Sequence, residues 1–371
     1  MRIVVPKEIH PGETRAPVVP ATVGRFVKAG AEVAVEAGLG QACDIPDEEY
    51  RKAGATIVAD RMELLKTGDM VLRLRKPPLE EIENLKKGAI HISFLDPFNE
   101  KELIERLARC GVTAISLEML PRSTIAQKMD ALSSQASLAG YAAVILAASR
   151  LSKIFPMMTT PAGTIKPARV FVVGAGVAGL QAIATAKRLG AVVEAFDTRP
   201  VVEEQVKSLG GKFVKIDIGE VGQTSGGYAK ELTGEQIEKQ REGMKKICGG
   251  ADIVITTAQV FGKRAPLIIT RDMISGMRPG GVIVDMAVES GGNVEGSRSG
   301  EDVVIGGVTI IGVANLPGRV ARDASLMFSN NLANLVEDFW DKQAKTFKLD
   351  LGNELLKACV VTHNGQVLFG R

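Results

Sequence analysis

Three glycines near the middle of the chain have the spacing that a phosphate-binding turn requires. Gly174, Gly176 and Gly179 form the pattern GxGxxG directly after the apolar, β-branched run at residues 170–173. The first glycine permits a tight turn, the second lets the backbone approach a pyrophosphate, and the third lets a helix pack closely on the strand. A helix that begins there presents free N–H groups and its positive dipole end to phosphates. These residues predict a dinucleotide site.

The residues that follow the glycines strengthen this interpretation because each lies at the offset that a dinucleotide-binding unit needs. Good helix formers run to Gly190, a second apolar run covers residues 192–196, and Asp197 follows it directly. A lone GxGxxG is weak evidence, whereas strand, turn, helix, strand and acid in this order are specific. Asp197 is placed to accept hydrogen bonds from an adenosine ribose and to repel a 2′-phosphate, which favours NAD over NADP. Arg199 keeps the alternative open, since it could pair with that phosphate.

Length and composition exclude several classes of protein. The 371 residues are 45% hydrophobic, enough for ample core and more than one ordinary domain. A net charge of +3 gives no electrostatic footprint for nucleic acid or an anionic membrane. The four cysteines and three histidines are scattered, so we expect no metal, no disulfides and a reducing, cytoplasmic setting. We expect no signal segment and no membrane span.

The first third of the chain alternates short apolar runs with helical stretches. This alternation predicts an α/β domain with a parallel sheet and helices on both faces. The strand candidates are residues 3–5, 32–35, 56–59, 70–74, 89–94 and 113–117, and the helix candidates are residues 21–29, 79–87 and 99–110.

The nucleotide-binding domain continues with more strands after Asp197. Candidates at residues 212–216, 253–256, 282–286 and 309–312 bring its total to six, which matches two mononucleotide-binding halves. Long helical runs at about residues 129–151 and 324–340 enter and leave this domain, although the first of them could simply be a core helix. The tail carries Asn364-Gly365, a hairpin signal, and we expect it to rejoin the first domain.

We therefore predict an α/β protein with two doubly wound parallel-sheet domains, in which the second is a Rossmann domain inserted into the first. The predicted boundaries are residues 1–130 plus 325–371 for the first domain and residues 131–324 for the second.

Two polar loops are candidates for contact with the cofactor. Arg122, Gln127 and Asp130 precede the helix at residues 129–151, where the alternative is a charged surface turn that caps this helix. Gly227 and Tyr228 lie in the long connection at residues 216–252, which is typical of a mobile loop. The alternative for Tyr228 is local packing.

At these motifs the chain resembles the alanine dehydrogenase and nicotinamide nucleotide transhydrogenase superfamily. The matching stretches include PKE at residues 6–8, ETRA at 13–16, GAGVAG at 174–179 and VDMAVESGG at 284–292. The RxxxxQxxD pattern at residues 122–130 is similar to a loop in the NAD-binding domain I of proton-translocating transhydrogenase. The stretches at residues 226–231 and 315–319 resemble that domain as well.

The resemblance implies direct hydride transfer between NAD(H) on this chain and NADP(H) on a partner domain III, coupled to proton translocation by a membrane domain II. It also implies a homodimer on the cytoplasmic side, peripheral to the cell membrane through its partners. Gln127, Arg122 and Asp130 become the catalytic candidates, with Gln127 hydrogen-bonding near the nicotinamide. The candidate cofactor contacts are Arg122, Gln127, Asp130, Ser133, Gly174, Ala175, Gly176, Val177, Gly179, Asp197, Thr198, Arg199, Gly227, Tyr228, Gln240, Ala258 and Gln259.

Two other functions stay open, an alanine-type NAD-dependent amino-acid dehydrogenase and a non-catalytic NAD-sensing module. Where the dehydrogenases carry a substrate lysine and a histidine, this chain has Arg75 and Asp96, and their acid is replaced by Glu289, although Arg15 remains. Oxidising an amino acid requires a general base. Hydride transfer between two nicotinamides moves no proton at the reacting carbons, so the protein must supply only position and exclusion of water.

Overall fold

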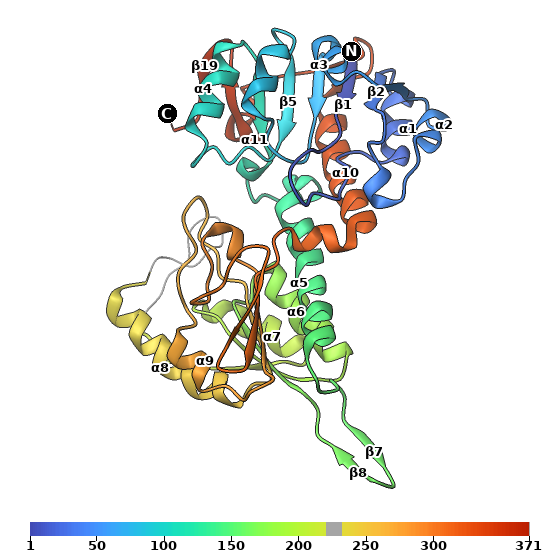
Figure 1. The fold of residues 1–371 in the computed structure, drawn as a ribbon. Helices are drawn as coiled ribbons and strands as arrows, with labels where there is room; N and C mark the ends of the chain where they lie inside the picture. The colour runs from blue at the N-terminus through green and yellow to red at the C-terminus, as the bar shows by residue number, and fades with distance from the viewer. Residues whose placement is uncertain (220–231, 371) are drawn as a thin grey trace. The chain divides into compact units, whose positions relative to one another are not determined.

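The computed structural model describes residues 1–219 and 232–370 and divides into two compact units (Figure 1). Unit 1 comprises Met1–Gln135 and Gly318–Arg371, and unit 2 comprises Ala136–Pro317. The predicted boundaries, after residues 130 and 324, therefore differ slightly from those of the units. The first boundary moves because the side-chain amide of Gln135 accepts a hydrogen bond from Arg15 and donates one to the carbonyl of Ala324, which ties the N-terminal end of helix α5 (Ala131–Arg150) to unit 1.

Unit 1 is built on an eight-stranded sheet with the order β19, β18, β6, β5, β4, β1, β2, β3. Strands β1 to β6 are parallel, and the chain winds outward from β1 to β3 before it returns to the other side of β1 with β4. This is the predicted doubly wound arrangement. The strands are β1 Arg2–Val5, β2 Glu32–Glu36, β3 Thr56–Val58, β4 Met70–Leu72, β5 Ile90–Ser93, β6 Thr113–Ser116, β18 Val360–His363 and β19 Gln366–Val367.

Helices cover both faces of this sheet because consecutive residues of a strand point to opposite sides. Ile3 belongs to a core cluster with residues of α1 and α10, whereas its neighbour Val4 packs in a second cluster with residues of α3 and α4. The helices of unit 1 are α1 Pro20–Lys28, α2 Asp47–Lys52, α3 Arg61–Thr67, α4 Lys101–Arg109, α10 Ala321–Asp338 and α11 Glu354–Cys359. A small hairpin, β16 (Trp340–Asp341) with β17 (Thr346–Phe347), follows α10.

Two predictions in unit 1 had opposite outcomes. The hairpin signal is confirmed, because β18 and β19 pair antiparallel through Asn364 and Gly365 with positive φ angles of 48° and 77°. The helix predicted at residues 79–87 is wrong in type and length, since Leu79–Asn84 forms a short 3₁₀ helix, η2. The side chain of Glu81, in the middle of η2, accepts hydrogen bonds from Arg61 and Arg73, which fix this short helix to its neighbours within unit 1.

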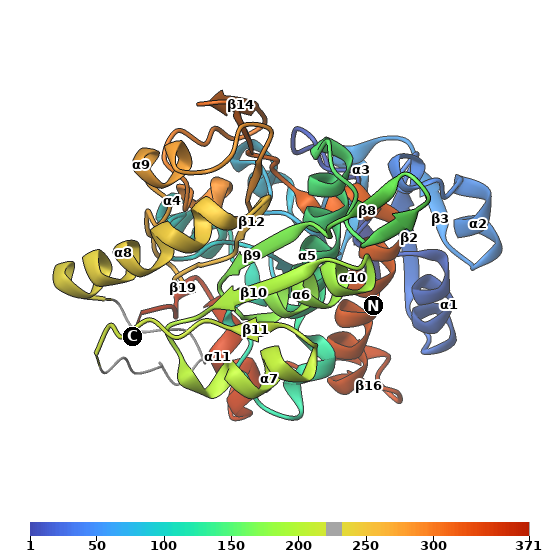
Figure 2. The same ribbon diagram turned by 90° about the horizontal axis from the view of Figure 1, so that it is seen from below.

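Unit 2 contains a seven-stranded sheet with the order β11, β10, β9, β12, β13, β15, β14, which confirms the predicted Rossmann arrangement. The first six strands in this order are parallel, and Figure 2 shows β9, β10 and β11 side by side. The strands are β9 Arg169–Val173, β10 Val192–Phe196, β11 Lys212–Phe213, β12 Ile253–Thr256, β13 Val282–Asp285, β14 Asp302–Ile305 and β15 Val308–Ile311.

Helices also cover both faces of the second sheet. Val170 and Val172 of β9 pack with residues of α5 and α6, whereas Phe171 packs with residues of α8 and α9. A Cβ at Gly140 of α5 would lie 2.2 Å from the carbonyl oxygen of Ala178, so this glycine permits the close approach of α5 and α6. The helices are α6 Val177–Arg188, α7 Glu203–Ser208, α8 Gly234–Gly250 and α9 Arg271–Ser275.

The sequence analysis missed two hairpins in unit 2. Strand β14 joins the sheet antiparallel to β15 through Gly306 and Gly307, both at positive φ. Strands β7 (Met158–Thr160) and β8 (Gly163–Ile165) form an exposed arm where the sequence analysis placed no strand, and Figure 1 shows it projecting from unit 2. Strand β14 has the sequence DVVI, and β7 and β8 have the sequences MTT and GTI, so these short segments lack the apolar–polar alternation that identifies a strand.

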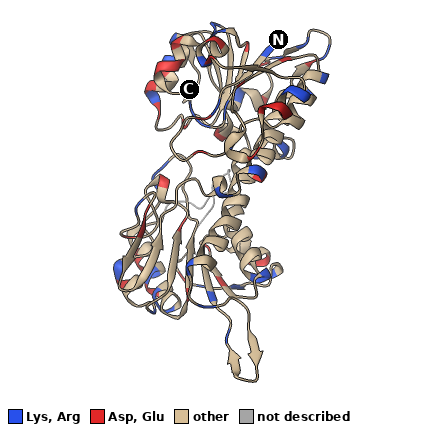
Figure 3. Ribbon diagram, turned by 45° about the vertical axis from the view of Figure 1, so that its right-hand side comes forward, with Lys and Arg blue, Asp and Glu red and all other residues tan. Residues whose placement is uncertain are grey.

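The described residues mix acidic and basic side chains and contain one helix of membrane-spanning length and composition. Figure 3 shows acidic and basic residues interspersed over both units. Within residues 1–219 and 232–370, only α5 is long and apolar enough to cross a bilayer by composition, and 44% of that stretch is buried. Core helices of globular proteins pass the same test, so this is weak evidence for a span.

Candidate dinucleotide site

The three glycines of the motif occupy positions with different spatial demands. Gly174 has φ +97°, and a Cβ there would lie 2.5 Å from Oγ1 of Thr257. A Cβ on Gly179 would lie 1.9 Å from the carbonyl oxygen of Gly174, which is far inside van der Waals contact. A Cβ on Gly176 would meet no atom within 4 Å. Two glycines are therefore needed by the fold, and the third leaves open space beside the backbone.

That space adjoins the N-terminus of α6, which fits a pyrophosphate. Gly176 is the N-cap residue, in extended conformation with φ −78° and ψ −167°, and no side chain caps the helix. The first N–H groups of a helix have no partner within it, and they carry the positive end of its dipole. Gly176 and Val177 thus present backbone donors to an anion, as expected for the phosphates of a dinucleotide.

Asp197 lies at the carboxyl end of β10, beside the glycine turn, as its position in the sequence predicts. Its Oδ2 accepts the backbone N–H of Ala175 at 2.7 Å, and its Oδ1 accepts the backbone N–H of Arg199 at 2.8 Å. The guanidinium of Arg199 bonds to both carboxylate oxygens, at 2.9 and 2.8 Å. The candidate ribose acceptor and the residue that could favour a 2′-phosphate are thus bonded to each other.

Buried polar residues that sequence reasoning missed hold the next strand end in place. The side chain of Asn293 accepts the N–H of Ala258 at 3.1 Å and donates to the carbonyl of Ala258 at 2.9 Å. The backbone N–H of Asn293 bonds in turn to both carboxylate oxygens of Asp285, at 3.1 Å each. Both side chains are fully buried. The segment with Ala258 and Gln259 therefore takes its shape from residues more than 25 positions away.

We expect Asn293→Ala to lower the free energy of unfolding by more than an average core truncation of the same size. Both backbone groups of Ala258 would lose their partner, which costs about 1–3 kcal/mol of unfolding free energy. NADH affinity should fall about tenfold, since a candidate contact segment loosens. Denaturant unfolding and NADH fluorescence titration measure the two effects. Asn99→Ala, which removes an exposed asparagine bonded to Asp96, is the control and should change neither.

The structure brings most of the predicted contacts of unit 2 to one edge of its sheet. The carboxyl ends of β9, β10 and β12 carry Gly174 to Gly179, Asp197 to Arg199, and Ala258 with Gln259. Gln240 differs, because it lies within α8 and is 6% exposed. Gly227 and Tyr228 lie outside the described residues.

The predicted polar loop belongs to unit 1, and its residues play different roles. Asp130 caps α5, because its carboxylate accepts the backbone N–H of Ser133 at 2.9 Å and the Ser133 hydroxyl at 2.5 Å. This agrees with the capping alternative for that one residue. Arg122 and Gln127 are exposed, and the Gln127 amide makes no hydrogen bond with another described residue. The loop therefore presents an uncharged amide outward.

Helix α10 anchors the backbone of this loop. The side chains of Asn331 and Asn334 donate to the carbonyl of Lys128 at 3.0 and 2.8 Å, and the Lys128 ammonium pairs with Asp338. Ala126 and Met129 are buried on either side of Gln127. The backbone that carries Gln127 is thus held at several points, although the side chain is free to reach a ligand.

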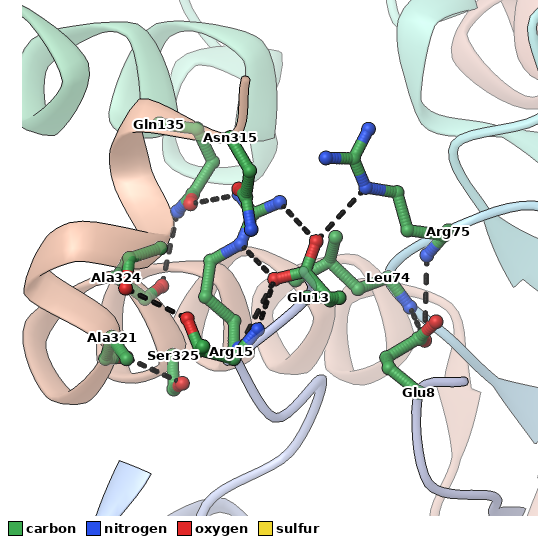
Figure 4. A network of polar contacts seen from close by, with 12 residues as sticks. Glu8, Glu13, Arg15, Leu74, Arg75, Gln135, Asn315, Ala321, Ala324 and Ser325 are labelled. Atoms are coloured by element: carbon green, nitrogen blue, oxygen red, sulfur yellow. Dashed lines mark hydrogen bonds and ion pairs between the residues drawn. The ribbon is translucent and has the colours of Figure 1, made fainter. Parts of the chain in front are cut away.

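Arg15 and Arg75, the arginines at positions that resemble those of a dehydrogenase substrate site, are bonded to a buried acid. Figure 4 shows Glu13 between the guanidinium groups of Arg15 and Arg75, which bond to it at 2.7 and 2.9 Å. Burial alone would raise the pKa of Glu13, but hydrogen bonds and charge from Arg15 and Arg75 outweigh it and lower the pKa to about 2. Glu13 therefore stays ionised and compensates both arginines.

The described residues hold no metal-binding cluster, and two of the cysteines are deeply buried. No group of three or more His, Cys, Asp or Glu within residues 1–219 and 232–370 is placed to hold a metal ion. Cys248 and Cys359 are buried, and this burial raises the pKa of each thiol to about 12. Both thiols are therefore protonated and unreactive at neutral pH.

The fold and the glycine site define a protein class, that of two-unit α/β proteins with a Rossmann dinucleotide-binding unit. The chain belongs to the alanine dehydrogenase/PNT family: the model of its N-terminal domain matches residues 4–139 and that of its C-terminal domain matches residues 143–370.

Relatives from both branches of this family are similar over almost the whole chain. The first of the polypeptides that make up NAD(P) transhydrogenase subunit alpha in Rhodospirillum rubrum is 45% identical over 375 residues, which cover 99% of this chain and 98% of that protein. The crystal structure of transhydrogenase from Sinorhizobium meliloti is 44% identical, covers 99% of this chain and 100% of its own, and has a TM-score of 0.89. An alanine dehydrogenase of Methanococcus maripaludis is 28% identical and covers 100% of this chain and 95% of its own.

Proposed function

We propose that this chain is the NAD(H)-binding subunit of a proton-translocating transhydrogenase, which transfers hydride directly between its NAD(H) and NADP(H) on a partner domain. The higher identity to transhydrogenase subunits than to the alanine dehydrogenase supports this branch of the family. A nicotinamide cofactor supplies the hydride chemistry itself. The chain would act with domain III and membrane domain II subunits, as a homodimer peripheral to the inner face of the cell membrane.

The observation that favours a transhydrogenase over an amino-acid dehydrogenase is the ion-pair network of Glu13. An amino-acid substrate needs a cation for its carboxylate and a base for its proton. Arg15 and Arg75 are instead satisfied by Glu13 and Gln135, with Glu13 ionised. Asp96, in the position of the dehydrogenase histidine, lies in a turn where its N–H bonds to Glu118. Described residues of unit 1 thus satisfy each other rather than prepare for proton abstraction.

Each group of residues proposed to bind the cofactor would hold a different part of the dinucleotide. The turn at Gly174 to Gly179 would hold the pyrophosphate on the helix terminus. Asp197 would accept hydrogen bonds from the adenosine ribose. We further propose that Gln127 acts at the nicotinamide, supported by its exposed amide on an anchored loop, with Arg122 and Asp130 shaping that loop. An amide can donate and accept hydrogen bonds without exchanging a proton, which suits a hydride transfer.

The test compares cofactor binding with amino-acid oxidation in one preparation. The purified chain should bind NADH but form none from NAD and L-alanine, while adding the NADP(H)-binding and membrane subunits should start hydride transfer. Formation of NADH from L-alanine would contradict the proposal and assign the chain to the dehydrogenase branch. Binding without transfer in the complete complex would favour the NAD-sensing alternative.

A further inference from the structure

Arg199 and Asp197 form an ion pair with two parallel hydrogen bonds at the edge of the proposed ribose site. Nε of Arg199 lies 2.9 Å from Oδ1 of Asp197, and Nη2 lies 2.8 Å from Oδ2. The two side chains are only 16% and 6% exposed. A paired guanidinium and carboxylate with little exposure are screened weakly by water and salt. This is a specific contact rather than a passing surface pair.

The hydrogen bonds of Asp197 are all taken by the protein itself. A carboxylate has about four acceptor positions. Oδ1 receives the backbone N–H and Nε of Arg199, and Oδ2 receives the backbone N–H of Ala175 and Nη2 of Arg199. The hydroxyls of an adenosine ribose would need acceptor positions on this same carboxylate. At least one of the present donors must therefore leave when a ribose binds.

Only the guanidinium can leave without a change in the fold. The N–H of Ala175 is held by the glycine turn, where Gly174 is bonded to Phe196 of β10. The N–H of Arg199 is two residues from Asp197 and closes a local turn with it. The guanidinium, by contrast, ends a side chain with several rotatable bonds, on a loop that precedes the 3₁₀ helix η5 (Pro200–Val202).

We propose that Arg199 sets the cofactor selectivity of unit 2 by competing with the adenosine ribose for Asp197. This inference rests on the proposed NAD(H) site. The guanidinium has to move off the carboxylate before ribose hydroxyls can bond there, so Arg199 weakens NAD(H) binding. While the pair is intact, its positive charge also cancels the repulsion that Asp197 would exert on a 2′-phosphate. Arg199 therefore lowers the preference for NAD(H) over NADP(H) in two ways: it weakens NAD(H) binding, and it reduces the repulsion of the 2′-phosphate of NADP(H).

The test is the affinity of the full chain for NADH and NADPH, measured by fluorescence titration on wild type and Arg199→Met. Methionine removes the charge and the hydrogen bonds but keeps an unbranched side chain. We expect the Kd for NADH to fall about fivefold or more, and the ratio of the NADPH and NADH Kd values to rise about tenfold. A Kd for NADH that is unchanged or higher in Arg199→Met would overturn the proposal.

Three further variants make the result specific. Arg188→Met removes an exposed charge at the other end of α6 and should leave both Kd values unchanged. In an Asp197→Asn background, which weakens NADH binding, Arg199→Met should no longer improve it; an equal improvement there would also overturn the competition. Arg199→Lys keeps the charge without the two-pronged geometry and should give a smaller gain, so it tests the idea if Arg199→Met fails to fold. If the wild type binds no NADH, the proposed function itself fails.

Discussion

Gln127→Asn should lower the rate of hydride transfer in the complete complex about 100-fold and leave the Kd for NADH within about twofold of the wild type. Asparagine keeps the amide but withdraws it by one methylene group. A misplacement of about 1 Å is enough to cost this factor when the contribution of the group is positional. Because the loop backbone is held through Lys128, Ala126 and Met129, it cannot follow the shortened side chain.

Lys128→Gln is the matched control for this experiment. It removes a half-exposed ion pair with Asp338 from the same loop but leaves the Lys128 carbonyl that α10 binds. Such a surface pair contributes about 1 kcal/mol or less, so transfer should be nearly unchanged. A rate for Gln127→Asn within threefold of the wild type would exclude the amide from the reaction. Equal losses in both variants would point to general disorder of the loop.

Gly179→Ala should destabilise unit 2 by about 3 kcal/mol, at the upper end of what overpacking costs, and abolish NADH binding. Its Cβ would lie 1.9 Å from the carbonyl oxygen and 2.9 Å from the carbonyl carbon of Gly174. Both are backbone atoms, so α6 itself would have to move away from β9. Alanine favours helix by up to about 1 kcal/mol over glycine, which is too little to compensate. Denaturant unfolding and NADH titration measure the two losses.

Gly176→Ala separates the role in the fold from the role in binding. Its φ of −78° and ψ of −167° suit alanine, and the added Cβ meets no protein atom within 4 Å. Stability should therefore stay within about 0.5 kcal/mol of the wild type. NADH affinity should nevertheless fall about 10- to 100-fold, because the methyl group enters the space proposed for the pyrophosphate. Undiminished affinity in Gly176→Ala would contradict this placement of the phosphates.

Much of the fold could be predicted from local sequence because the signals for its elements are local. The β-branched runs of the parallel strands, the glycine turn and Asn364-Gly365 each act within a few residues. The errors fall where that local signal is weak. Residues 79–87 have helical composition but form the short 3₁₀ helix η2, and β14 and the β7 to β8 arm lack apolar alternation.

Sequence alone determined that unit 2 carries a glycine turn, a helix terminus and an acid at the end of β10, because these lie at set offsets along one stretch of chain. Only the tertiary structure decided how they are bonded. Asn293 meets Ala258 across 35 residues, and Gln135 meets Arg15 across 120. The sequence places Arg199 two residues after Asp197, so their pairing could have been predicted. It does not show that the acceptor positions of the Asp197 carboxylate are then all occupied. Hydrogen-bond saturation depends on every neighbour in space, and a linear pattern does not contain it.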